Sequence, residues 1–302
     1  MTELAAEELE TEKRRRMARW LSGSGIEIGA LHHPLSVPEG VQVRYVDRMP
    51  ESELRQHYKE LEGETFAPIS IIGDAQDLSN IEDGSVDFVI ANHLVEHLDN
   101  PIRGLEEMVR ALRPGGVLYL ALPDPRVTFD FERQLTSVQH LIDEYRNGPA
   151  QTREAHFRDW VVKAEPHTHF GSAENVDERV QILLRMAYSI HYHLWRPDTF
   201  LDFLSAVRLE TGIELELVDF APCDHGKDNE FIFVFLKGIA ALPVAIPPLP
   251  PPLDEALPVP GATQAEATAN GWVTGLRRRL GASPVGPLVR PVYRAGRQLL
   301  KR

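Results

Sequence analysis

The chain has 302 residues, of which 43% are hydrophobic, enough for one large core with appendages. Its formal net charge of -13 disfavours non-specific nucleic-acid binding by the body of the protein. Cys223 is the only cysteine, which excludes an internal disulfide and a cysteine-based metal cluster. The N-terminal stretch is charged throughout and no run of 18 apolar residues occurs, so we expect a cytoplasmic protein without a signal peptide or a spanning helix.

Short apolar runs rich in β-branched residues recur through the first 124 residues. Near-continuous runs of this kind are typical of strands buried on both faces of a parallel sheet. We expect five such strands, at residues 25–30, 41–47, 68–74, 86–92 and 116–124. A helical pattern lies before the last of them, with Asn100 as its cap, Pro101 in its first turn and Pro114 at its end. This alternation predicts a doubly wound α/β domain.

The pattern changes after the fifth predicted strand. Residues 126–188 are mostly helical in character, and one more amphipathic helix begins near Pro197. Two strands follow, at 213–222 and 229–238, and their short connection makes them antiparallel neighbours. The predicted fold is therefore a Rossmann-like sheet of seven strands, mostly parallel, with a terminal antiparallel hairpin and a helical lid inserted at about 126–196.

Composition divides the chain into three regions. Residues 1–238 form the predicted α/β domain. Residues 239–270 contain eight prolines and are typical of a stiff spacer. Residues 271–302 carry eight Lys or Arg and no acid, with apolar residues interspersed. Such a tail is either a disordered solubilising segment or an amphipathic one that contacts an anionic membrane, here the inner membrane, or a glycosyltransferase partner.

The stretch "VIANHLVEHLDNP" contains the motif H-x-x-E-H, formed by His93, Glu96 and His97. On a helix, this spacing could bind zinc with the glutamate as general base. However, His93 directly follows the fourth predicted strand, and ligands bind at the carboxyl ends of strands in open α/β sheets. We therefore disfavour a zinc peptidase and assign no metal-ligand set. His97 is expected either to pack beneath the loop or to act on substrate.

Glycines and acids follow the first three strands in a recognisable order. Three glycines at the first strand allow close approach of a ligand, namely Gly23, Gly25 and Gly29. Asp47 lies 20 residues after Glu27 at the end of the second strand, a spacing that suits the ribose hydroxyls of an adenosine. Asp74 follows the third strand and could accept from an adenine amino group. Each acid alone could equally be a cap or a turn residue.

Taken together, residues 23–124 resemble the class I S-adenosylmethionine-dependent methyltransferases of the methyltransferase type 11 kind. The motifs that carry the resemblance are "GSGIEIGALHHP", "GDAQDL", "DFVIANHLVEHLDNP" and "LRPGGVLYLALPD". The resemblance continues to about residue 238 through "HYHLWRPDTFLDFL" and "NEFIFVFLK", which are similar to a bacterial subgroup associated with glycosyltransferases and polysaccharide biosynthesis. It implies S-adenosylmethionine as cofactor and a hydroxyl of a saccharide or glycan precursor as acceptor.

The resemblance also implies which residues hold the cofactor, from its amino-acid end through ribose and adenine to the sulfonium: Glu27, Gly29, Asp47, Asp74, Ala75, Asn92 and His93. The chain departs from the family pattern after Gly29, where two glycines are missing and His32, His33 and Pro34 follow. Pro34 opposes the usual following helix. We therefore expect a cofactor loop with a different path, in which one of the two histidines could contact ligand.

A poorly nucleophilic hydroxyl needs a base or a metal. The candidate catalytic residues are His191, His193, His97 and Asp124. His191 and His193 are expected on one face of an extended stretch with Trp195, whose ring could stack on a sugar, and are ranked above His97. Asp124 and Asp130 offer oxygen ligands for magnesium, although their spacing is not diagnostic.

Two other classes of function remain open. One is an inactive cofactor-binding scaffold in a polysaccharide assembly complex. The other is a nicotinamide dehydrogenase, which the terminal antiparallel hairpin disfavours. The sequence predicts an enzyme acting on a small-molecule or glycan acceptor and no nucleic-acid partner.

Overall fold

The computed structural model describes residues 12–238, so the predicted linker and basic tail lie outside the described residues. One mixed sheet runs through this part of the chain in the order β3-β2-β1-β4-β5-β7-β6. Its strands are β1 (Ser24–Ile28), β2 (Gln42–Asp47), β3 (Ile69–Ile72), β4 (Val86–Asn92), β5 (Leu112–Pro123), β6 (Leu215–Ala221) and β7 (Glu230–Lys237). The first five pair in parallel, whereas β7 is antiparallel to both β5 and β6. The predicted fold class is confirmed.

Helices cover the sheet and extend beyond one of its ends. Residues 12–18 are helical. The longer helices that follow are α2 (Glu51–His57), α3 (Pro101–Ala111), α4 (Val138–Asn147), α5 (Arg153–Lys163), α6 (Val176–Arg185) and α7 (Pro197–Thr211). Five short 3-10 turns connect them: η1 (Lys59–Leu61), η2 (Val95–His97), η3 (Pro125–Val127), η4 (Pro149–Gln151) and η5 (Glu165–His167).

Helix α3 begins and ends where the sequence predicts. The Asn100 side chain accepts a hydrogen bond from Arg103 N at 3.1 Å, and Pro101 occupies the first turn, where its missing N–H leaves no hydrogen bond unmade. The helix ends at Ala111, before Pro114. Strand β5 begins four residues earlier than expected, because Leu112 already pairs with Val86 ahead of a register shift.

The sheet separates two apolar cores because successive residues of a strand point to opposite faces. On one face α3 and α7 pack through Leu105, Phe200 and Phe203. On the other, Met17 and neighbours from the N-terminal helix cover a row of strand residues that includes Phe88. Parallel strands covered on both faces leave the two ends of the sheet as the places where a ligand can enter.

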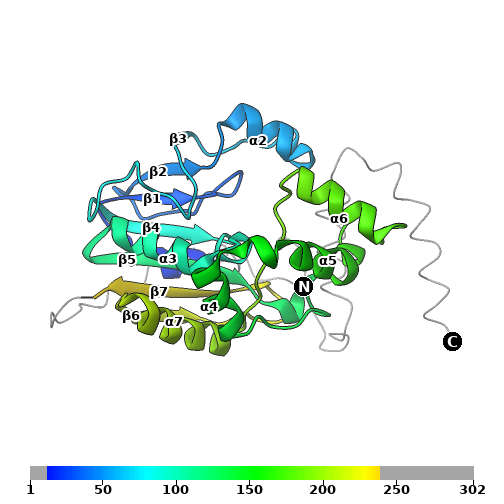
Figure 1. Ribbon diagram of the computed structural model, residues 1–302. Coiled ribbons are helices and arrows are strands. Elements are labelled where there is room, and N and C mark those ends of the chain that lie inside the picture. The colour runs from blue at the N-terminus through cyan, green and yellow to red at the C-terminus, as the bar shows by residue number, and fades with distance from the viewer. Residues whose placement is uncertain (1–11, 239–302) are drawn as a thin grey trace, which may run out of the picture.

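The segment between β5 and α7 forms a lid with a small core of its own. Phe157, Trp160 and Leu183 are buried where α5 packs against α6. Figure 1 shows α5 and α6 (green) beyond the carboxyl ends of the parallel strands, on the same side as α2. The predicted helical insertion therefore lies where it can cover a ligand at those strand ends.

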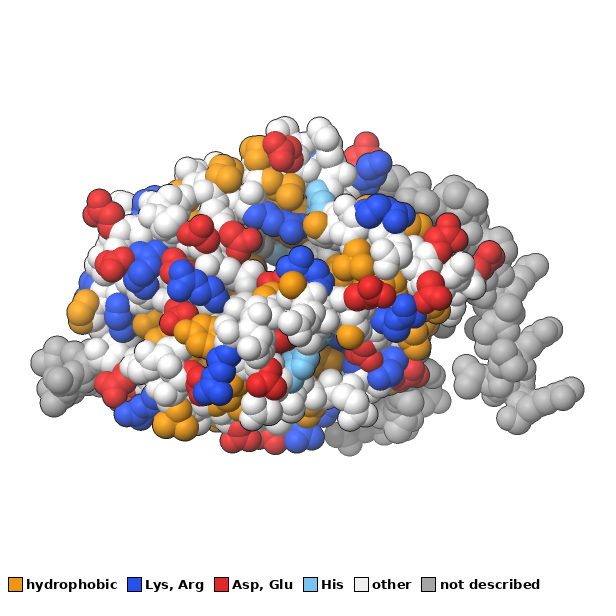
Figure 2. All heavy atoms as spheres, viewed as in Figure 1, with side chains coloured by type: hydrophobic (Ala, Val, Ile, Leu, Met, Phe, Trp, Pro, Cys, Tyr) orange, Lys and Arg blue, Asp and Glu red, His pale blue; other side chains and the backbone are white. Residues whose placement is uncertain are grey.

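Among residues 12–238, no helix is both long and apolar enough to cross a bilayer. On the face of the molecule seen in Figure 2, acidic and basic side chains are interspersed. Tail contacts with a membrane or a glycosyltransferase stay predictions, since residues 271–302 lie outside the described part of the chain.

Candidate functional site

A cavity of about 480 Å³ opens at the carboxyl ends of β1, β2 and β4, beneath the lid. The cavity lies between β1 and β4. From β1 the strand order runs outward to β2 and β3 on one side, and to β4 and β5 on the other. Ligands prefer this switch point in open α/β sheets. Its wall includes most of the predicted cofactor residues: Gly29, Asp47, Asp74, Ala75 and His93. The structure thus brings together residues that are up to 64 positions apart in the sequence.

Of the three predicted glycines, only Gly29 borders the cavity. Its φ of +70° is left-handed, a conformation that favours glycine, and the loop after it contains no helix. Gly25 lies inside β1, where an added Cβ would collide with Phe88 of β4. Gly23 is packed as closely against Asp87. These two glycines let strands approach each other, so their predicted role at the ligand is wrong.

The missing helix after Gly29 agrees with the expected effect of Pro34. The loop continues through Leu31, which has a φ of +47° and borders the cavity. His32 and His33 stack on each other with ring centroids 3.9 Å apart and are not part of the cavity wall. The loop takes a different path, as predicted, but it presents backbone and Leu31 to the cavity instead of histidine.

Asp47 and Asp74 reach the cavity from the ends of β2 and β3. Asp47 is only 7% exposed, and its Oδ1 accepts from Arg48 N at 2.7 Å. Burial raises its pKa, and the hydrogen bonds from the Arg48 and Met49 backbone partly offset this. Asp74 accepts from Gln76 N at 2.8 Å, which holds the following turn. Both acids combine a structural hydrogen bond with a place in the cavity wall.

Glu27 does not border the cavity as expected. Its carboxylate is fully buried and accepts from Leu35 N at 3.0 and 3.1 Å, so it holds the loop that follows Gly29. Asn92 donates to Glu27 Oε1 at 3.2 Å, while its own Oδ1 is buried without a hydrogen-bond partner. Glu27 and Asn92 thus shape the cavity from behind, and Asn92 is also absent from its wall.

Because burial raises the pKa of Glu27 to about 7, the stability of the protein should fall as pH rises. Between the unfolded value of 4.5 and about 7 the folded state binds the extra proton, so deprotonation favours unfolding, by about 3 kcal/mol in total. Glu27→Gln should remove the share of this slope that Glu27 contributes, since glutamine stays neutral and can donate to Asn92 Oδ1. Urea unfolding at pH 5 to 8 measures it, with the exposed Glu53→Gln as control. An unchanged slope in Glu27→Gln would contradict the assignment.

His93 follows β4 in a left-handed conformation, with φ +48°, and is not part of a helix. Its Nε2 donates to Glu230 Oε2 at 2.8 Å, and Glu230 also accepts two hydrogen bonds from Arg14. Although burial raises the pKa of Glu230, His93 and Arg14 lower it well below its usual range, so the carboxylate stays charged. This fixes the His93 ring in the cavity wall, and the helical zinc-peptidase geometry is absent, as predicted.

His97 borders the cavity from η2 and its tautomer is fixed. Nδ1 lies 2.9 Å from Ile190 O, which can only accept, so Nδ1 carries the proton and Nε2 keeps its lone pair. Burial lowers the pKa of His97 well below its ordinary value, which keeps the ring neutral. Adjacent Glu96 is 1% exposed, and neither carboxylate oxygen has a hydrogen-bond partner; burial raises its pKa to about 7.

His191 stands behind His97 and does not border the cavity. The two rings meet edge to face with centroids 4.7 Å apart. His191 Nδ1 lies 2.6 Å from Asp130 Oδ2, and Arg133 donates to Asp130 Oδ1 at 2.8 Å. His191 is therefore held by a buried carboxylate, and the predicted direct contact of His191 with acceptor does not match its position. The expected order, with His191 ahead of His97, is reversed by geometry.

His193 and Trp195 lie still deeper. His193 is fully buried beside Glu144 of the lid, and Trp195 is 2% exposed, stacked on Phe203 with centroids 5.3 Å apart. The indole belongs to the core beneath α7 and cannot stack on a sugar, so that prediction is wrong. This extended segment is not a strand, and its His193 and Trp195 side chains point inward, against Glu144 of α4 and Phe203 of α7.

Asp124 and Asp130, the two carboxylates considered as magnesium ligands, are each paired with a different arginine. Asp124 accepts two hydrogen bonds from the Arg126 guanidinium, at 2.9 and 2.6 Å. Burial raises the pKa of Asp124, but the hydrogen bonds and the charge of Arg126 lower it by more. The net shift of this pKa is therefore downward. Asp130 is used by Arg133 and His191. Neither carboxylate faces the other, and neither borders the cavity, so a shared divalent ion and a base role for Asp124 find no support in this arrangement.

Sequence reasoning missed the polar and aromatic side chains that complete the wall. They come from the segments that flank α2, the loops after β3 and before α3, and the lid: Arg48, Tyr58, Gln76, Asp99, Arg153, Phe157, Tyr188, Ser189 and Tyr192. Tyr192 N donates to Glu96 O at 2.7 Å, which joins the lid to the loop after β4. Only tertiary contacts select these residues, since none stands at a motif spacing.

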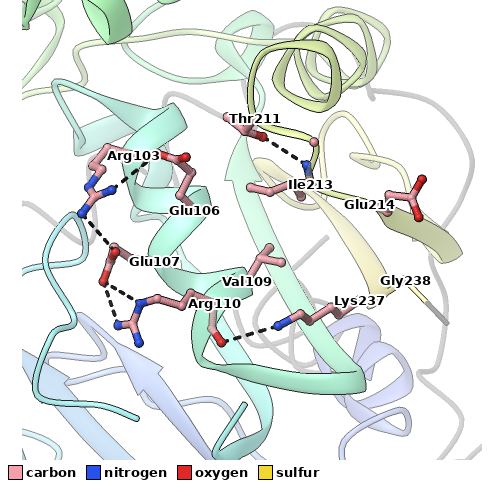
Figure 3. A pocket seen from close by; sticks show the side chains of 11 residues that line it. Arg103, Glu106, Glu107, Val109, Arg110, Thr211, Ile213, Glu214, Lys237 and Gly238 are labelled. Atoms are coloured by element: carbon pink, nitrogen blue, oxygen red, sulfur yellow. Dashed lines mark hydrogen bonds and ion pairs between the residues drawn. The ribbon is translucent and has the colours of Figure 1, made fainter. Parts of the chain in front are cut away.

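A second hollow of about 440 Å³ lies at the other end of the sheet, near the last turn of α3 and the end of β7. Figure 3 shows its charged side chains turned toward one another. Arg103 and Arg110 both pair with Glu107, and Lys237 Nζ lies 3.5 Å from Arg110 O. Because this second hollow adjoins the amino ends of the parallel strands, the first cavity is the better ligand site.

Comparisons with known proteins identify the domain. Residues 22–120 match the family model of a methyltransferase domain. An uncharacterised 37.1 kDa protein from transposon TN4556 of Streptomyces fradiae is 31% identical over 131 residues, covering 42% of this chain and 36% of that protein. The chain thus aligns with little more than a third of that relative's length.

Solved structures with a similar fold include a SAM-dependent methyltransferase from Methanosarcina mazei, with 18% identity, a TM-score of 0.41, and coverage of 73% of this chain and 96% of that one. Another is a SAM-dependent methyltransferase from Thermotoga maritima, described as a possible histamine N-methyltransferase, with 15% identity, a TM-score of 0.36, and coverage of 78% and 98%.

The mostly parallel sheet ends in the β7-β6 hairpin and has its cavity at the β1/β4 reversal, which is a Rossmann-like arrangement. Residues 22–120, about a third of the chain, are similar to a methyltransferase domain. The family implies S-adenosylmethionine as cofactor, and the wall fits it: an acid at the end of β2, a glycine at the end of β1, and Asp74 with Ala75 after β3.

Proposed function

We propose that this protein transfers a methyl group from S-adenosylmethionine to a hydroxyl of a saccharide or glycan precursor. The observation that carries the proposal is the cavity itself, whose wall includes Asp47, Gly29 and Asp74 together with His97. The acceptor class is supported by the rest of the wall, which mixes aromatic rings with charged and amide groups. Such a surface suits a ligand with apolar ring faces and many hydroxyls.

The acids would hold the cofactor. Asp47 accepts from the ribose hydroxyls, and Asp74 from the adenine amino group. Bound there, S-adenosylmethionine supplies a methyl carbon that the acceptor oxygen attacks while the carbon–sulfur bond breaks, leaving S-adenosylhomocysteine. Positioning the two reactants can supply ~7–11 kcal/mol of barrier reduction.

His97 would take the proton that the acceptor hydroxyl loses. Its Nδ1–H is committed to Ile190 O, so Nε2 is the atom available to accept. His191 and Asp130 act as positioning residues behind it, since the His191 ring supports the His97 face and is itself held by the carboxylate. The proton can pass on to solvent through the open side of the cavity.

Ligand binding and turnover test the proposal separately. S-Adenosylmethionine and S-adenosylhomocysteine should raise the melting temperature, whereas NADH should not. Incubation with methyl-labelled S-adenosylmethionine and a panel of saccharides should then transfer label to a hydroxyl. Binding without transfer to any acceptor would favour the inactive scaffold, and stabilisation by NADH alone would favour a dehydrogenase.

A further inference from the structure

Four potential metal ligands converge within the lid, and none of them borders the cofactor cavity. His140 and Glu144 come from α4, His156 from α5, and His193 from the extended segment before α7. One ligand atom of each lies within 4.8 Å of all the others. Glu144 Oε1 is 3.0 Å from His140 Nε2 and 2.8 Å from His156 Nε2, and Oε2 is 3.3 Å from His193 Nε2.

The local structure explains this convergence. His140 and Glu144 are four residues apart on α4, which places them on one face of the helix. The His140, His156 and His193 rings cross at 61 to 81°, with centroids 5.0 to 5.9 Å apart. Steeply crossed rings cannot stack, so they meet through their edges. The two Nε2 atoms of His140 and His156 are 3.1 Å apart.

Hydrogen bonds alone leave this cluster incompletely satisfied. Glu144 Oε1 is approached by His140, His156 and the Thr152 hydroxyl together, whereas Oε2 has no hydrogen-bond partner. His193 is fully buried, and neither of its ring nitrogens has a hydrogen-bond partner. Each buried unpaired group of this kind costs ~1–3 kcal/mol. A cation at the centre would engage the Glu144 carboxylate and one ring nitrogen of His193.

We propose that His140, Glu144, His156 and His193 bind one Zn²⁺ ion. Three imidazoles and a carboxylate are ligands that zinc accepts, and tetrahedral bonds of ~2.0–2.1 Å would separate the ligand atoms by about 3.3 Å. Four of the separations given above, 2.8 to 3.3 Å, are close to this spacing, and all the ligand atoms lie within 4.8 Å of one another. Four protein ligands leave no open position, so the ion is structural.

Such an ion would tie together the three parts of the lid. Its ligands join α4 and α5 to the segment that also carries Tyr192, which borders the cofactor cavity and bonds to Glu96 O. The ion would thereby hold the lid over the cavity without touching substrate. This inference does not rest on the proposed methyl transfer.

Two smaller clusters provide matched controls. Glu96, His97 and His191 form one, and Asp124, Cys223 and His225 the other, each with three potential ligands. In the second, Asp124 is already bonded to Arg126. His97→Ala and His225→Ala therefore each remove a histidine from a competing cluster.

The test is metal binding by the full chain. After chelator treatment, the protein should take up one equivalent of Zn²⁺, and Co²⁺ should give the visible absorption of a tetrahedral ion. His140→Ala removes a ligand whose side chain is 33% exposed, so its effect on folding is small. It should lower the affinity by more than the ~10–100-fold that loss of an outer-shell partner costs. His97→Ala and His225→Ala should bind like wild type.

Chelation should also lower the melting temperature of the wild type but not that of His140→Ala, with Glu144→Gln as a second ligand variant of similar volume. Failure of the folded, metal-free wild type to take up Zn²⁺ or Co²⁺ would overturn the site. So would wild-type affinity and spectrum in both ligand variants, or a loss of binding confined to His97→Ala or His225→Ala.

Discussion

Replacing His97 by asparagine should lower the single-turnover rate of methyl transfer by ~10²–10⁴-fold, the usual contribution of a general base. The asparagine amide can still donate toward Ile190 O, where His97 Nδ1 donates at 2.9 Å, but it cannot accept a proton. The variant therefore separates the chemistry of the ring from its packing. Affinity for S-adenosylmethionine, measured by calorimetry, should stay near wild type.

The pH profile adds a readout that a structural role would not produce. Burial lowers the pKa of His97 well below 6.5, so the wild-type rate should stay level as pH falls through that value and drop only at lower pH. His169→Ala, an exposed lid histidine, is the matched control and should leave rate and profile unchanged. A wild-type rate in His97→Asn would refute the histidine base and direct attention to Glu96, whose buried carboxylate lies next in sequence and 3.6 Å from His93 Nδ1.

Replacing Asp47 by alanine should weaken S-adenosylmethionine binding on the order of 10²-fold or more. A hydrogen bond to a charged group contributes about 1.5–3 kcal/mol, so each lost ribose contact raises the dissociation constant roughly 10–100-fold. Asp47 is suited to this role because it ends β2 in the cavity wall and is only 7% exposed, so that its bonds to a ligand would be shielded from water. Calorimetry with S-adenosylmethionine and S-adenosylhomocysteine measures the loss.

Two companion variants sharpen this test. Asp47→Asn keeps one acceptor and should lie between wild type and alanine, whereas Asp202→Ala, on the exposed side of α7, should bind like wild type. Circular dichroism and urea unfolding confirm that each variant is folded. An Asp47→Ala protein that is folded and binds both ligands with unchanged affinity would show that the ribose is held elsewhere.

The sequence predicted the position of a site residue correctly where that position depends only on the secondary structure around it. Asp47, Asp74 and Gly29 each end a strand, so their position at the ligand edge follows once the strands are recognised. The prediction from sequence was wrong where the role of a residue depends on which other segments bury its side chain. Trp195 and His193 were read as a ligand-facing row, but α4 and α7 bury them. Glu27 was placed at the cofactor, yet its carboxylate is used by Leu35 N.

The sequence by itself determined the order of strands and helices and the antiparallel end of the sheet. It also determined that the segment around Pro34 is a loop and not a helix. These depend on periodicity, glycine, proline and connection length, which act over a few residues. Only the tertiary structure decided that His97, and not His191 or His193, borders the cavity, and that His140, Glu144, His156 and His193 meet at one point. Those outcomes depend on how α4, α5 and the segment before α7 pack against each other. Contacts between segments so far apart in the chain leave no regular spacing in a single sequence.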